Sequence, residues 1–374
     1  MDSVTKRVLV YRLGSLGDTV VGLPAFYLVA RAFPEAERRL LTNFPVQAKA
    51  APAAAVLEGT GTVSGYFRYA KGSRSPMELA RVWWEIVRWR PQVLVYLAAA
   101  RGLDSARRDA RFFRLCGIKQ LVGVPLNKDM QENRWEPGSG RLRAATAPQD
   151  DGWFEPEAAR LVRNIAELGD ASLDDPASWD LRLTEAERNR ADELMGGANG
   201  RPAIAVSMGT KLQANDWGRD NWRALLARLA EMYPCYALSM VGSADEREAS
   251  EFAAQGWREV AVVRKKPAKV VNLCGVLTPR QSAAVMARAA LFLGHDSGPV
   301  HLAAAVQTPC VAIYSARNKP RVWFPYGAKH SVVYHRVDCW GCELETCIAE
   351  QKKCIASIAV EEVAAEVNKM LEPC

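Results

Sequence analysis

A turn in the last third of the chain brings together residue types that can bind an anion. The segment LGHDSGPVH, which ends at His301, predicts the end of a buried strand, a turn, and a helix that begins at Pro299. The free amides of a first helical turn and the helix dipole attract a phosphate. Gly298 leaves room for its approach, and Ser297 and His301 can add hydrogen bonds. The alternative is structural: Ser297 caps the helix and Asp296 braces the turn.

A second glycine-rich turn lies near the N-terminus, in the sequence LGSLGD that ends at Asp18. Gly14, Ser15 and Gly17 let the backbone approach a substrate with little obstruction by side chains. Asp18 closes the turn and can cap the helix that follows. The turn lacks the G-x-G-x-x-G spacing of a dinucleotide-binding fingerprint, so a dehydrogenase is not indicated.

Nine cysteines divide mainly into two groups by their neighbours. Four are crowded together with the spacing C-x2-C-x4-C-x6-C: Cys339, Cys342, Cys347 and Cys354. Four thiolates can close a tetrahedral zinc or iron site, and a reducing compartment favours metal over disulfides. The alternative is a cysteine-rich segment without metal. Another four lie in apolar surroundings and are expected to be small core residues: Cys116, Cys235, Cys274 and Cys310.

Apolar runs supply the elements that must position these turns. In the first half, strands are predicted at 7–12, 39–42 and 92–97, and helices at 23–33 and 82–90. In the second half, strands are predicted at 203–208, 236–242, 291–294 and 310–314, with helices at 220–232, 244–255, 279–289 and 360–371. Strands that alternate with helices form parallel sheets. The repeated rhythm predicts an α/β protein with two Rossmann-like domains facing a central cleft.

The carboxyl ends of the second-half strands converge on that cleft. Ser207, Gly209 and Thr210 end one of these strands and offer another place for a phosphate. Glycine, proline and aspartate accumulate between 136 and 180 around one short predicted helix, which places the linker near 170–179. We therefore expect one domain over residues 1–174, a second over 175–335, and a cysteine-rich segment with a C-terminal helix over 336–374.

Composition indicates an ordinary soluble globular protein. The chain has 374 residues, of which 49% are hydrophobic and 24% charged, and no apolar stretch is long enough to span a bilayer. Arg12 and Asp18 interrupt the first apolar run, which is unlike a signal peptide, so we expect a cytoplasmic protein. A net charge of +7 favours anionic partners. Its basic residues are dispersed, and no nucleic-acid-binding motif is found.

One stretch of the first half is rich in arginine and tryptophan. Its arginines are expected to lie mainly on a solvated helix face, although some could line the side of an anionic acceptor: Arg101, Arg107, Arg108, Arg111 and Arg114. The tryptophans are expected to pack in the core, and a peripheral contact with the inner membrane stays open: Trp83, Trp84 and Trp89.

Taken together, the two turns resemble the hallmarks of glycosyltransferase family 9, the bacterial heptosyltransferases. That family has a D-S/T-G-x-x-H-L-A-A-A segment followed by G-T-P and a strand, and here DSGPVHLAAA is followed by QTP and CVAIY. Its N-terminal hallmark, R-x-S-S-L-G-D-x-x-x-x-L-P-A, is matched by RLGSLGDTVVGLPA. The departures are Gln307 for the glycine and Gly14 for the first serine. The resemblance covers nearly the whole chain and implies a GT-B fold.

The resemblance also implies an activity and roles for residues. It implies inverting transfer of a sugar from a nucleotide diphosphate, usually ADP-heptose, onto lipopolysaccharide-core or related anionic glycan or glycolipid acceptors, with no catalytic metal. Asp18 would be the general base, with Gly14, Ser15 and Gly17 on the acceptor side. Donor contacts are implied for Asp296 at the sugar, for the turn Ser297, Gly298 and Pro299 with His301 at the pyrophosphate, and for Glu246 near the nucleoside. Glu246 also fits a solvated helix face.

One departure from the family concerns the donor phosphates. The family has lysine two residues before the tryptophan of its K-x-W motif, and Asn215 stands there in this chain, with Lys211 as a candidate replacement. Three hypotheses therefore stay open. The chain uses ADP-heptose, or uses another nucleotide sugar or a protein acceptor, or is a catalytically silent paralogue that binds a nucleotide sugar, a glycan or a protein.

Overall fold

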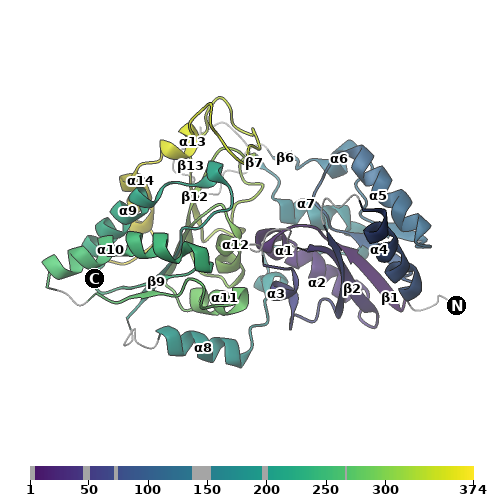
Figure 1. The fold of residues 1–374 in the computed structure, drawn as a ribbon, viewed down its shortest axis with the longest axis horizontal. Coiled ribbons are helices and arrows are strands. Elements are labelled where there is room, and N and C mark those ends of the chain that lie inside the picture. The colour runs from purple at the N-terminus through teal and green to yellow at the C-terminus, as the bar shows by residue number, and fades with distance from the viewer. Residues whose placement is uncertain (1–4, 45–50, 71–74, 137–152, 196–200, 266–267) are drawn as a thin grey trace. The chain divides into compact units, whose positions relative to one another are not determined.

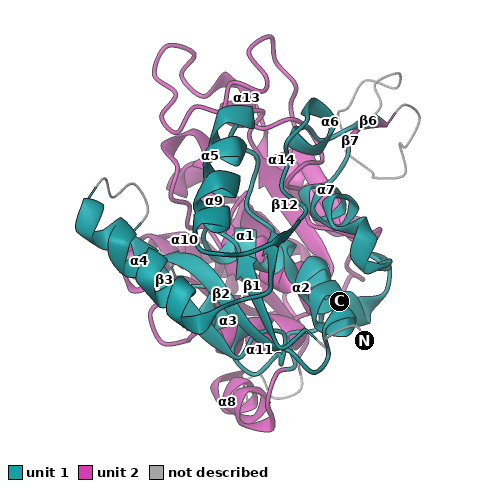
Figure 2. Ribbon diagram, turned by 90° about the vertical axis from the view of Figure 1, so that its right-hand side faces the viewer, with its two compact units in different colours: residues 1–135, 155–182 teal, residues 136–154, 183–374 magenta. Residues whose placement is uncertain are grey.

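The computed structural model describes residues 5–44, 51–70, 75–136, 153–195, 201–265 and 268–374. It divides into two compact units, which Figure 2 distinguishes by colour. Unit 1 comprises residues 1–135 and 155–182, and unit 2 comprises residues 136–154 and 183–374. None of the helices in these described ranges is long and apolar enough to cross a bilayer.

Unit 1 is built on a five-stranded parallel sheet (Figure 1). Its strands are β1 (Arg7–Tyr11), β2 (Glu37–Phe44), β3 (Gly65–Ala70), β4 (Val93–Tyr96) and β5 (Gln120–Val122). Its helices are α1 (Leu16–Val21), α2 (Leu23–Ala32), α3 (Ala54–Leu57), α4 (Pro76–Trp89), α5 (Leu103–Leu115), α6 (Lys128–Gln131) and α7 (Glu157–Asn164), with 3-10 turns η1 (Ala166–Leu168) and η2 (Pro176–Trp179). Between the units in sequence lie the short strands β6 (Trp135–Glu136) and β7 (Trp153–Phe154).

Unit 2 is built on a six-stranded parallel sheet. Its strands are β8 (Ala203–Ser207), β9 (Ala237–Met240), β10 (Val270–Asn272), β11 (Leu291–His295), β12 (Cys310–Tyr314) and β13 (Ser331–Tyr334). Its helices are α8 (Glu185–Met195), α9 (Arg219–Met232), α10 (Arg247–Val263), α11 (Pro279–Ala287), α12 (Gly298–Ala305), α13 (Lys353–Ala356) and α14 (Val360–Asn368), with 3-10 turns η4 (Gln213–Asn215) and η5 (Ala244–Glu246).

The strand order reverses once in each sheet. Unit 1 has the order β3-β2-β1-β4-β5, and unit 2 the order β10-β9-β8-β11-β12-β13. Connections on the two sides of the reversal leave the sheet in opposite directions, so a crevice opens beyond the carboxyl ends of the two strands between which the order reverses. Those strands are β1 and β4 in unit 1, and β8 and β11 in unit 2. In unit 2, Gly294 pairs with Ser207 at this edge.

The main elements predicted from the apolar runs are confirmed, and their ends shift by a few residues. Strand β12 has the predicted bounds, whereas α4 begins six residues before the predicted 82–90 and α10 continues to Val263. The sequence analysis missed the short strands β3, β5, β10 and β13. These lie at or next to the edges of the sheets, where a run of three to six residues gives little periodicity to detect.

The two units divide the chain elsewhere than the predicted boundaries. Unit 1 continues to Arg182 because the chain still packs on α2 there: the Tyr27 hydroxyl donates to the Asp180 carbonyl at 2.6 Å. The cysteine-rich segment belongs to unit 2, where the Ala214 amide donates to the Glu345 carbonyl at 3.1 Å. Of the loop-rich stretch predicted between 136 and 180, residues 137–152 lie outside the described residues.

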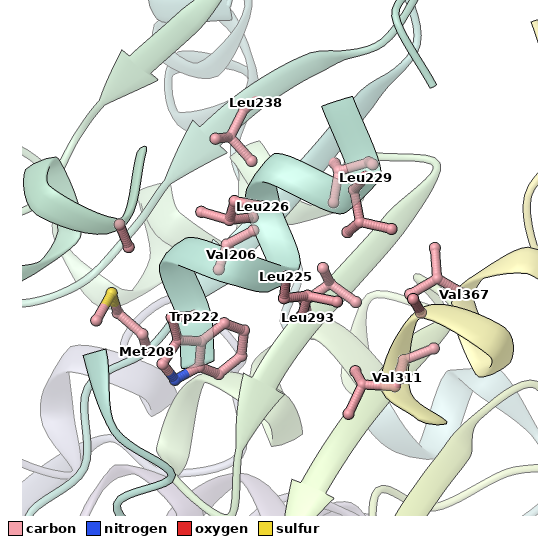
Figure 3. Close-up of a cluster of buried hydrophobic side chains, with 14 of the residues drawn as sticks. Val206, Met208, Trp222, Leu225, Leu226, Leu229, Leu238, Leu293, Val311 and Val367 are labelled. Atoms are coloured by element: carbon pink, nitrogen blue, oxygen red, sulfur yellow. The ribbon is translucent and has the colours of Figure 1, made fainter. Parts of the chain in front are cut away.

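The main core cluster of unit 2 lies on one face of its sheet and includes residues of the last helix. Figure 3 shows Leu225, Leu226 and Leu229 of α9 among strand residues such as Val206 and Leu293, while Val367 of α14 contributes from the end of the chain. Each of these side chains is at most 1% exposed. Burying a leucine of this kind contributes roughly 1.5–3 kcal/mol, so α14 is part of the domain and not an appendage.

The expectation that Cys235 is a free core residue is wrong. Cys235 forms a disulfide with Cys374, across 139 residues of sequence and with a Cα–Cα distance of 5.8 Å. The bond joins the turn between α9 and β9 to the last residue of the chain. The sequence could not indicate this pair, because the two cysteines meet only after α14 has packed against α9.

Helices α9 and α10 approach each other closely at one glycine, and this yields a stability prediction. A Cβ on Gly256 would lie 2.4 Å from the Arg223 carbonyl oxygen, a backbone atom that can yield only if the helices separate. Gly256→Ala should therefore lower the free energy of unfolding by about 1–3 kcal/mol from overpacking, which exceeds the roughly 1 kcal/mol gained from helix propensity. Urea denaturation measures the change. Gln255→Ala, at the exposed neighbouring position, is the control and should change little. A variant as stable as the parent would contradict this packing.

Candidate active site

Two predicted donor segments lie at the strand-order reversal of unit 2. The loop after β8 contains Gly209, Thr210 and Lys211, and the loop after β11 contains the turn that leads into α12. Since β8 and β11 are neighbours in the sheet, their carboxyl ends adjoin. The fold thus brings together two turns that are about ninety residues apart in sequence.

Asp296 is held in place by two side-chain amides. Asn215 Nδ2 donates to the Asp296 carboxylate at 3.3 Å and to its carbonyl at 3.2 Å, while Asn318 Nδ2 donates to the same carboxylate oxygen at 3.1 Å. Asn215 is buried, and its own oxygen accepts a 2.6 Å hydrogen bond from the Ser315 hydroxyl. Because Asn215 is fixed at both ends, the Asp296 carboxylate has a defined orientation. Asn318 and Ser315 were not identified from the sequence.

His295 is a further residue that the sequence analysis passed over. The side chain is fully buried, and its Nε2 accepts hydrogen bonds from the Trp217 amide at 3.2 Å and from Trp222 Nε1 at 3.1 Å. An indole N–H and a backbone N–H can only donate, so Nε2 is the unprotonated nitrogen. Burial lowers the pKa of His295 to about 4, which keeps the ring neutral. These hydrogen bonds connect the start of α9 to the end of β11, and His295 is the residue directly before Asp296.

The turn after Asp296 has the expected strand–turn–helix form. α12 begins at Gly298, with Pro299 in its first turn and Ser297 at the N-cap. Among the described residues, the Ser297 side chain makes no capping hydrogen bond to the helix, which argues against the purely structural interpretation of this serine. Its hydroxyl lies 3.4 Å from the His295 carbonyl. His301 is buried, with 5% of its surface exposed.

The end of β8 contributes small polar groups. The buried Ser207 hydroxyl has no hydrogen-bond partner within the described part of the chain. Thr210 turns its hydroxyl towards the backbone of its own loop, where it accepts from the Leu212 amide at 3.3 Å. Lys211 is exposed at the loop surface.

Glu246 turns inward and does not lie on a solvated helix face. Its carboxylate accepts from the Ser243 amide at 3.0 Å in a capping box at η5. A Cβ added to Gly209 or Gly242 would meet this carboxylate at 2.0 and 2.2 Å. Both glycines follow strand ends, of β8 and β9, so the missing side chains make room for an acid group at the carboxyl edge of the sheet.

In unit 1, Asp18 lies at the strand-order reversal, at the start of α1. One carboxylate oxygen accepts from the Ser15 amide at 2.7 Å and from its hydroxyl at 3.0 Å, so Asp18 does cap the helix. The other oxygen lies 3.9 Å from the Arg12 guanidinium. Gly14, with φ of 147°, is required here, because a Cβ would lie 2.3 Å from the Asp18 side chain. Gly17 is buried in the first turn of α1.

Arg12 is 1% exposed and stabilises this turn from the interior of unit 1. It donates to the Leu97 carbonyl at 2.5 Å and to the Asp18 carbonyl at 2.6 Å, and lies 3.9 Å from the buried Glu157. Burial lowers the pKa of Arg12, and the nearby Asp18 and Glu157 oppose that shift. The signal in the sequence was an arginine directly after the buried run Val8 to Tyr11.

Comparison with known proteins decides the family. A model of glycosyltransferase family 9 (heptosyltransferase) matches residues 150–353, more than half of the chain. The chain belongs to glycosyltransferase family 9.

Individual relatives agree with this family. Lipopolysaccharide heptosyltransferase 1 of Pseudomonas aeruginosa is 25% identical over 388 residues, which cover 98% of both chains. Lipooligosaccharide heptosyltransferase 2 of Campylobacter jejuni is 28% identical over 114 residues, which span 30% of this chain and about a third (35%) of that relative.

Solved structures show the fold of this family 9 chain. ADP-heptose LPS heptosyltransferase II of E. coli superposes with a TM-score of 0.63 at 17% identity, over 97% of this chain and 98% of that one. E. coli heptosyltransferase WaaC with ADP-2-deoxy-2-fluoro heptose has a TM-score of 0.61 at 16% identity, over 97% and 99%. The predicted α/β class and GT-B fold, with two Rossmann-like domains, are confirmed.

The arginines of this family 9 chain separate into two kinds. Arg101 is tied to the carboxyl ends of β1 and β4: it donates to the Tyr11 hydroxyl at 3.1 Å and pairs with Asp109, to which Tyr96 also donates. Burial raises the pKa of Tyr96 to about 12, so the phenol stays a donor. The others lie on the exposed face of α5: Arg107, Arg108, Arg111 and Arg114.

The predicted metal site does not fit the arrangement of the cysteines. Cys339 and Cys354 are half-buried, Cys342 is exposed and Cys347 is buried. In the described residues, no group of three or more His, Cys, Asp or Glu side chains is placed to hold a metal ion. The loop instead packs on the segment before Asn215, where the Cys347 amide donates to Gln213 at 2.9 Å.

The buried histidines predict how stability depends on pH. Burial lowers the pKa of both His295 and His330 to about 4, against 6.5 for an exposed ring. Between pH 6.5 and 4 the unfolded chain therefore binds protons that the folded chain does not, so stability falls as pH falls through this window. Each ring should cost on the order of 3 kcal/mol of unfolding free energy by pH 4. Above pH 6.5 neither contributes.

Urea denaturation across this pH range tests the assignment. His295→Gln keeps an acceptor for the tryptophan donors and removes the titration, so its stability should fall by about half as much between pH 6.5 and 4. His330→Gln is the matched variant and should remove the other half. An unchanged slope in His295→Gln would mean that the ring is already protonated or accessible at pH 6.

Proposed function

We propose that this chain is an inverting heptosyltransferase that uses ADP-heptose and an anionic lipopolysaccharide-core or related glycolipid acceptor. The observation that carries the proposal is family 9 membership together with a chain-long match to a lipopolysaccharide heptosyltransferase, 98% of each chain. Similar solved structures support the donor, since E. coli WaaC was solved with ADP and with ADP-2-deoxy-2-fluoro heptose.

The geometry of unit 2 supports a nucleotide diphosphate. The first turn of α12 offers amides and a helix dipole to a phosphate, and Gly298 leaves space beside them. Ser207, buried with an unsatisfied hydroxyl, ends the neighbouring strand. The Glu246 carboxylate lies against Gly209 and Gly242. It is suited to bind the hydroxyls of a ribose, because an ionised carboxylate only accepts hydrogen bonds and a hydroxyl can donate them. Thr210 and Lys211 would complete the phosphate side.

Asp296 is suited to the sugar of the donor. Its carboxylate is oriented by two amides, and a carboxylate can accept hydrogen bonds from two neighbouring hydroxyls. A phosphate would be repelled by the same charge. This division assigns the sugar to Asp296 and the pyrophosphate to the helix turn that follows it.

Asp18 is proposed as the general base that takes the proton from the acceptor hydroxyl as it attacks the anomeric carbon, while ADP leaves with its bond electrons. The carboxylate is 26% exposed, and its capping hydrogen bonds from Ser15 fix its direction. The acceptor would then lie against the turn formed by Gly14, Ser15 and Gly17. Capping and proton transfer are compatible, because one oxygen receives both hydrogen bonds from Ser15.

A second donor is favoured by one observation. Asn215 stands where the family has lysine, and it is hydrogen bonded to Asp296. A change next to the proposed sugar contact supports a different nucleotide sugar as the second candidate. Isothermal titration calorimetry with ADP-heptose, UDP-glucose and GDP-mannose distinguishes the two, since only the true donor should bind more tightly than its nucleoside diphosphate.

Replacement of Asp18 tests the proposed base. Asp18→Asn keeps the shape and one acceptor oxygen but cannot take a proton, so turnover should fall about a hundred- to ten-thousand-fold, with ADP affinity unchanged. Asp104→Asn, at a 99% exposed site of unit 1, is the control. Both are measured by release of ADP with a soluble core-oligosaccharide acceptor. Near-normal turnover by Asp18→Asn would leave this residue only the role of a cap.

Two substitutions in one turn should separate phosphate from sugar. Gly298→Val should weaken ADP and ADP-heptose alike, because its side chain blocks the approach to the helix amides. Asp296→Ala should bind ADP at least as tightly as the parent, because it removes a negative charge, and should lose about ten- to a hundred-fold in affinity for ADP-heptose, the value of a hydrogen bond to a charged group. Calorimetry decides, with the fully exposed Asp338→Ala as control. Unaltered ADP binding by Gly298→Val would place the phosphate elsewhere.

A further inference from the structure

Helix α4 of unit 1 is apolar on both of its faces. Val82, Ile86 and Trp89 point into the core, as expected for an amphipathic helix on a sheet. The opposite side carries large apolar residues that the described part of unit 1 leaves exposed: Met77 is 81% exposed and Trp84 is 58% exposed. Leu79 and Trp83 are also exposed on this helix. The expectation that the tryptophans pack in the core therefore holds for Trp89 and is wrong for Trp83 and Trp84.

The C-terminal end of α5 extends this apolar surface. Trp83 Nε1 donates to the Leu115 carbonyl at 3.2 Å, which fixes the end of α5 beside α4 (Figure 1). Leu115 itself is 74% exposed. This hydrogen bond is itself exposed, and it holds the ring of Trp83 at the surface, where the ring of Trp84 lies 6.5 Å away between centroids.

Most of the net positive charge of the chain lies in the same segment. Residues 76–119 contain nine basic and four acidic residues, an excess of five, against +7 for all 374 residues. On α5, Arg107, Arg111 and Arg114 recur at helical spacing and are exposed, and Leu115 follows the last of them. Basic and apolar side chains therefore share one surface.

The acidic residues of the segment do not cancel this charge at the surface. Glu78 and Glu85 both pair with Arg81, and Asp109 is buried against Arg101. Asp104 is exposed at the start of α5 and lies 3.4 Å from Arg107. In the described ranges, Arg111 and Arg114 have no acidic partner.

We propose that this α4–α5 face binds the surface of an anionic lipid bilayer; the face comprises Met77, Leu79, Trp83, Trp84 and Leu115 with Arg107, Arg111 and Arg114. Tryptophan is suited to the boundary between headgroups and acyl chains, since it has an apolar ring and one polar N–H. Arginine and lysine near an anionic surface each add electrostatic attraction. A purely apolar docking partner would not account for the basic residues.

The inference goes beyond sugar transfer and does not depend on the donor or the acceptor. It adds to the proposed function a means of holding the enzyme where a glycolipid acceptor is found. Because vesicle binding needs no nucleotide sugar, failure of this inference and failure of the proposed transfer are separate results.

Cosedimentation of the full chain with vesicles tests the face. Vesicles of phosphatidylcholine with an equal amount of phosphatidylglycerol should bind the protein, and phosphatidylcholine alone should bind it at least about tenfold more weakly. Binding should weaken as salt is raised, because salt screens the arginines. Arg111→Glu with Arg114→Glu should reduce binding about tenfold or more. Trp84→Ser with Leu115→Ser should do the same at any salt concentration.

Val262→Ser with Val263→Ser is the matched control. These valines are 76% and 82% exposed at the end of α10 in unit 2, also beside basic residues, but without an aromatic ring. The control should bind vesicles as the parent does, and the urea midpoint of each variant checks that it folds. Quenching of parent tryptophan fluorescence by lipids brominated in the acyl chain adds a test that needs no variant.

Several results would overturn the proposal. They are a parent that does not bind the anionic vesicles or is not quenched, variants of the α4–α5 face that bind as the parent does, or loss of binding confined to the valine control. If Trp84→Ser changes the oligomeric state in analytical ultracentrifugation, a second copy of the chain covers this face and the lipid assignment is wrong. Turnover on a soluble acceptor should stay unchanged in the variant with Trp84→Ser and Leu115→Ser, because neither residue has a proposed role in transfer.

Discussion

The reversal of strand order in each parallel sheet is the constraint on which both candidate sites depend. Neighbouring strands on opposite sides of the reversal send their connections to opposite faces, and ligands of open α/β sheets bind at the carboxyl edge between such strands. In unit 2 this edge lies between β8 and β11, and in unit 1 between β1 and β4. Every segment proposed for the chemistry follows one of these strands or the adjoining β9. The sheet topology therefore sets which distant turns can meet.

The two units stabilise their turns with different buried polar groups. Unit 2 uses neutral ones: the imidazole of His295 and the amide of Asn215, whose hydrogen bonds cost little desolvation. Unit 1 uses charge, with Arg12 and Arg160 sharing the buried Glu157. A buried ion costs several kcal/mol unless it is paired, so this cluster is tolerated because each charge has an opposite neighbour. It holds the backbone of the Asp18 turn through the Asp18 carbonyl and sets the Arg12 guanidinium 3.9 Å from one oxygen of the carboxylate.

Features encoded by a few neighbouring residues could be predicted from the sequence, and features that depend on distant residues could not. The Gly14 turn and the α12 start are encoded within ten residues, since glycine, proline and a capping serine each restrict the backbone where they stand. Glu246 could be named from the sequence, but its inward direction depends on Gly209, nearly forty residues away. The groups that orient Asp296 could not be predicted. Ser315 and Asn318 lie in the loop after β12, and they come near Asp296 only once β12 has paired with β11. The cysteine spacing indicated metal, yet four thiols need converging directions that spacing alone does not specify.

Asn215 shows how one substitution alters the electrostatics of the proposed donor site. A lysine at this position would set an ammonium group beside the Asp296 carboxylate, and each charge would reduce the other's effect on a ligand. An asparagine orients the same carboxylate through a 3.3 Å hydrogen bond and leaves its charge in place. In the proposed site, Asp296 would then accept more strongly from sugar hydroxyls and repel phosphate more strongly. The diphosphate would be directed towards the α12 amides and the loop with Lys211, so charge as well as shape would separate the sugar from the phosphates along one turn.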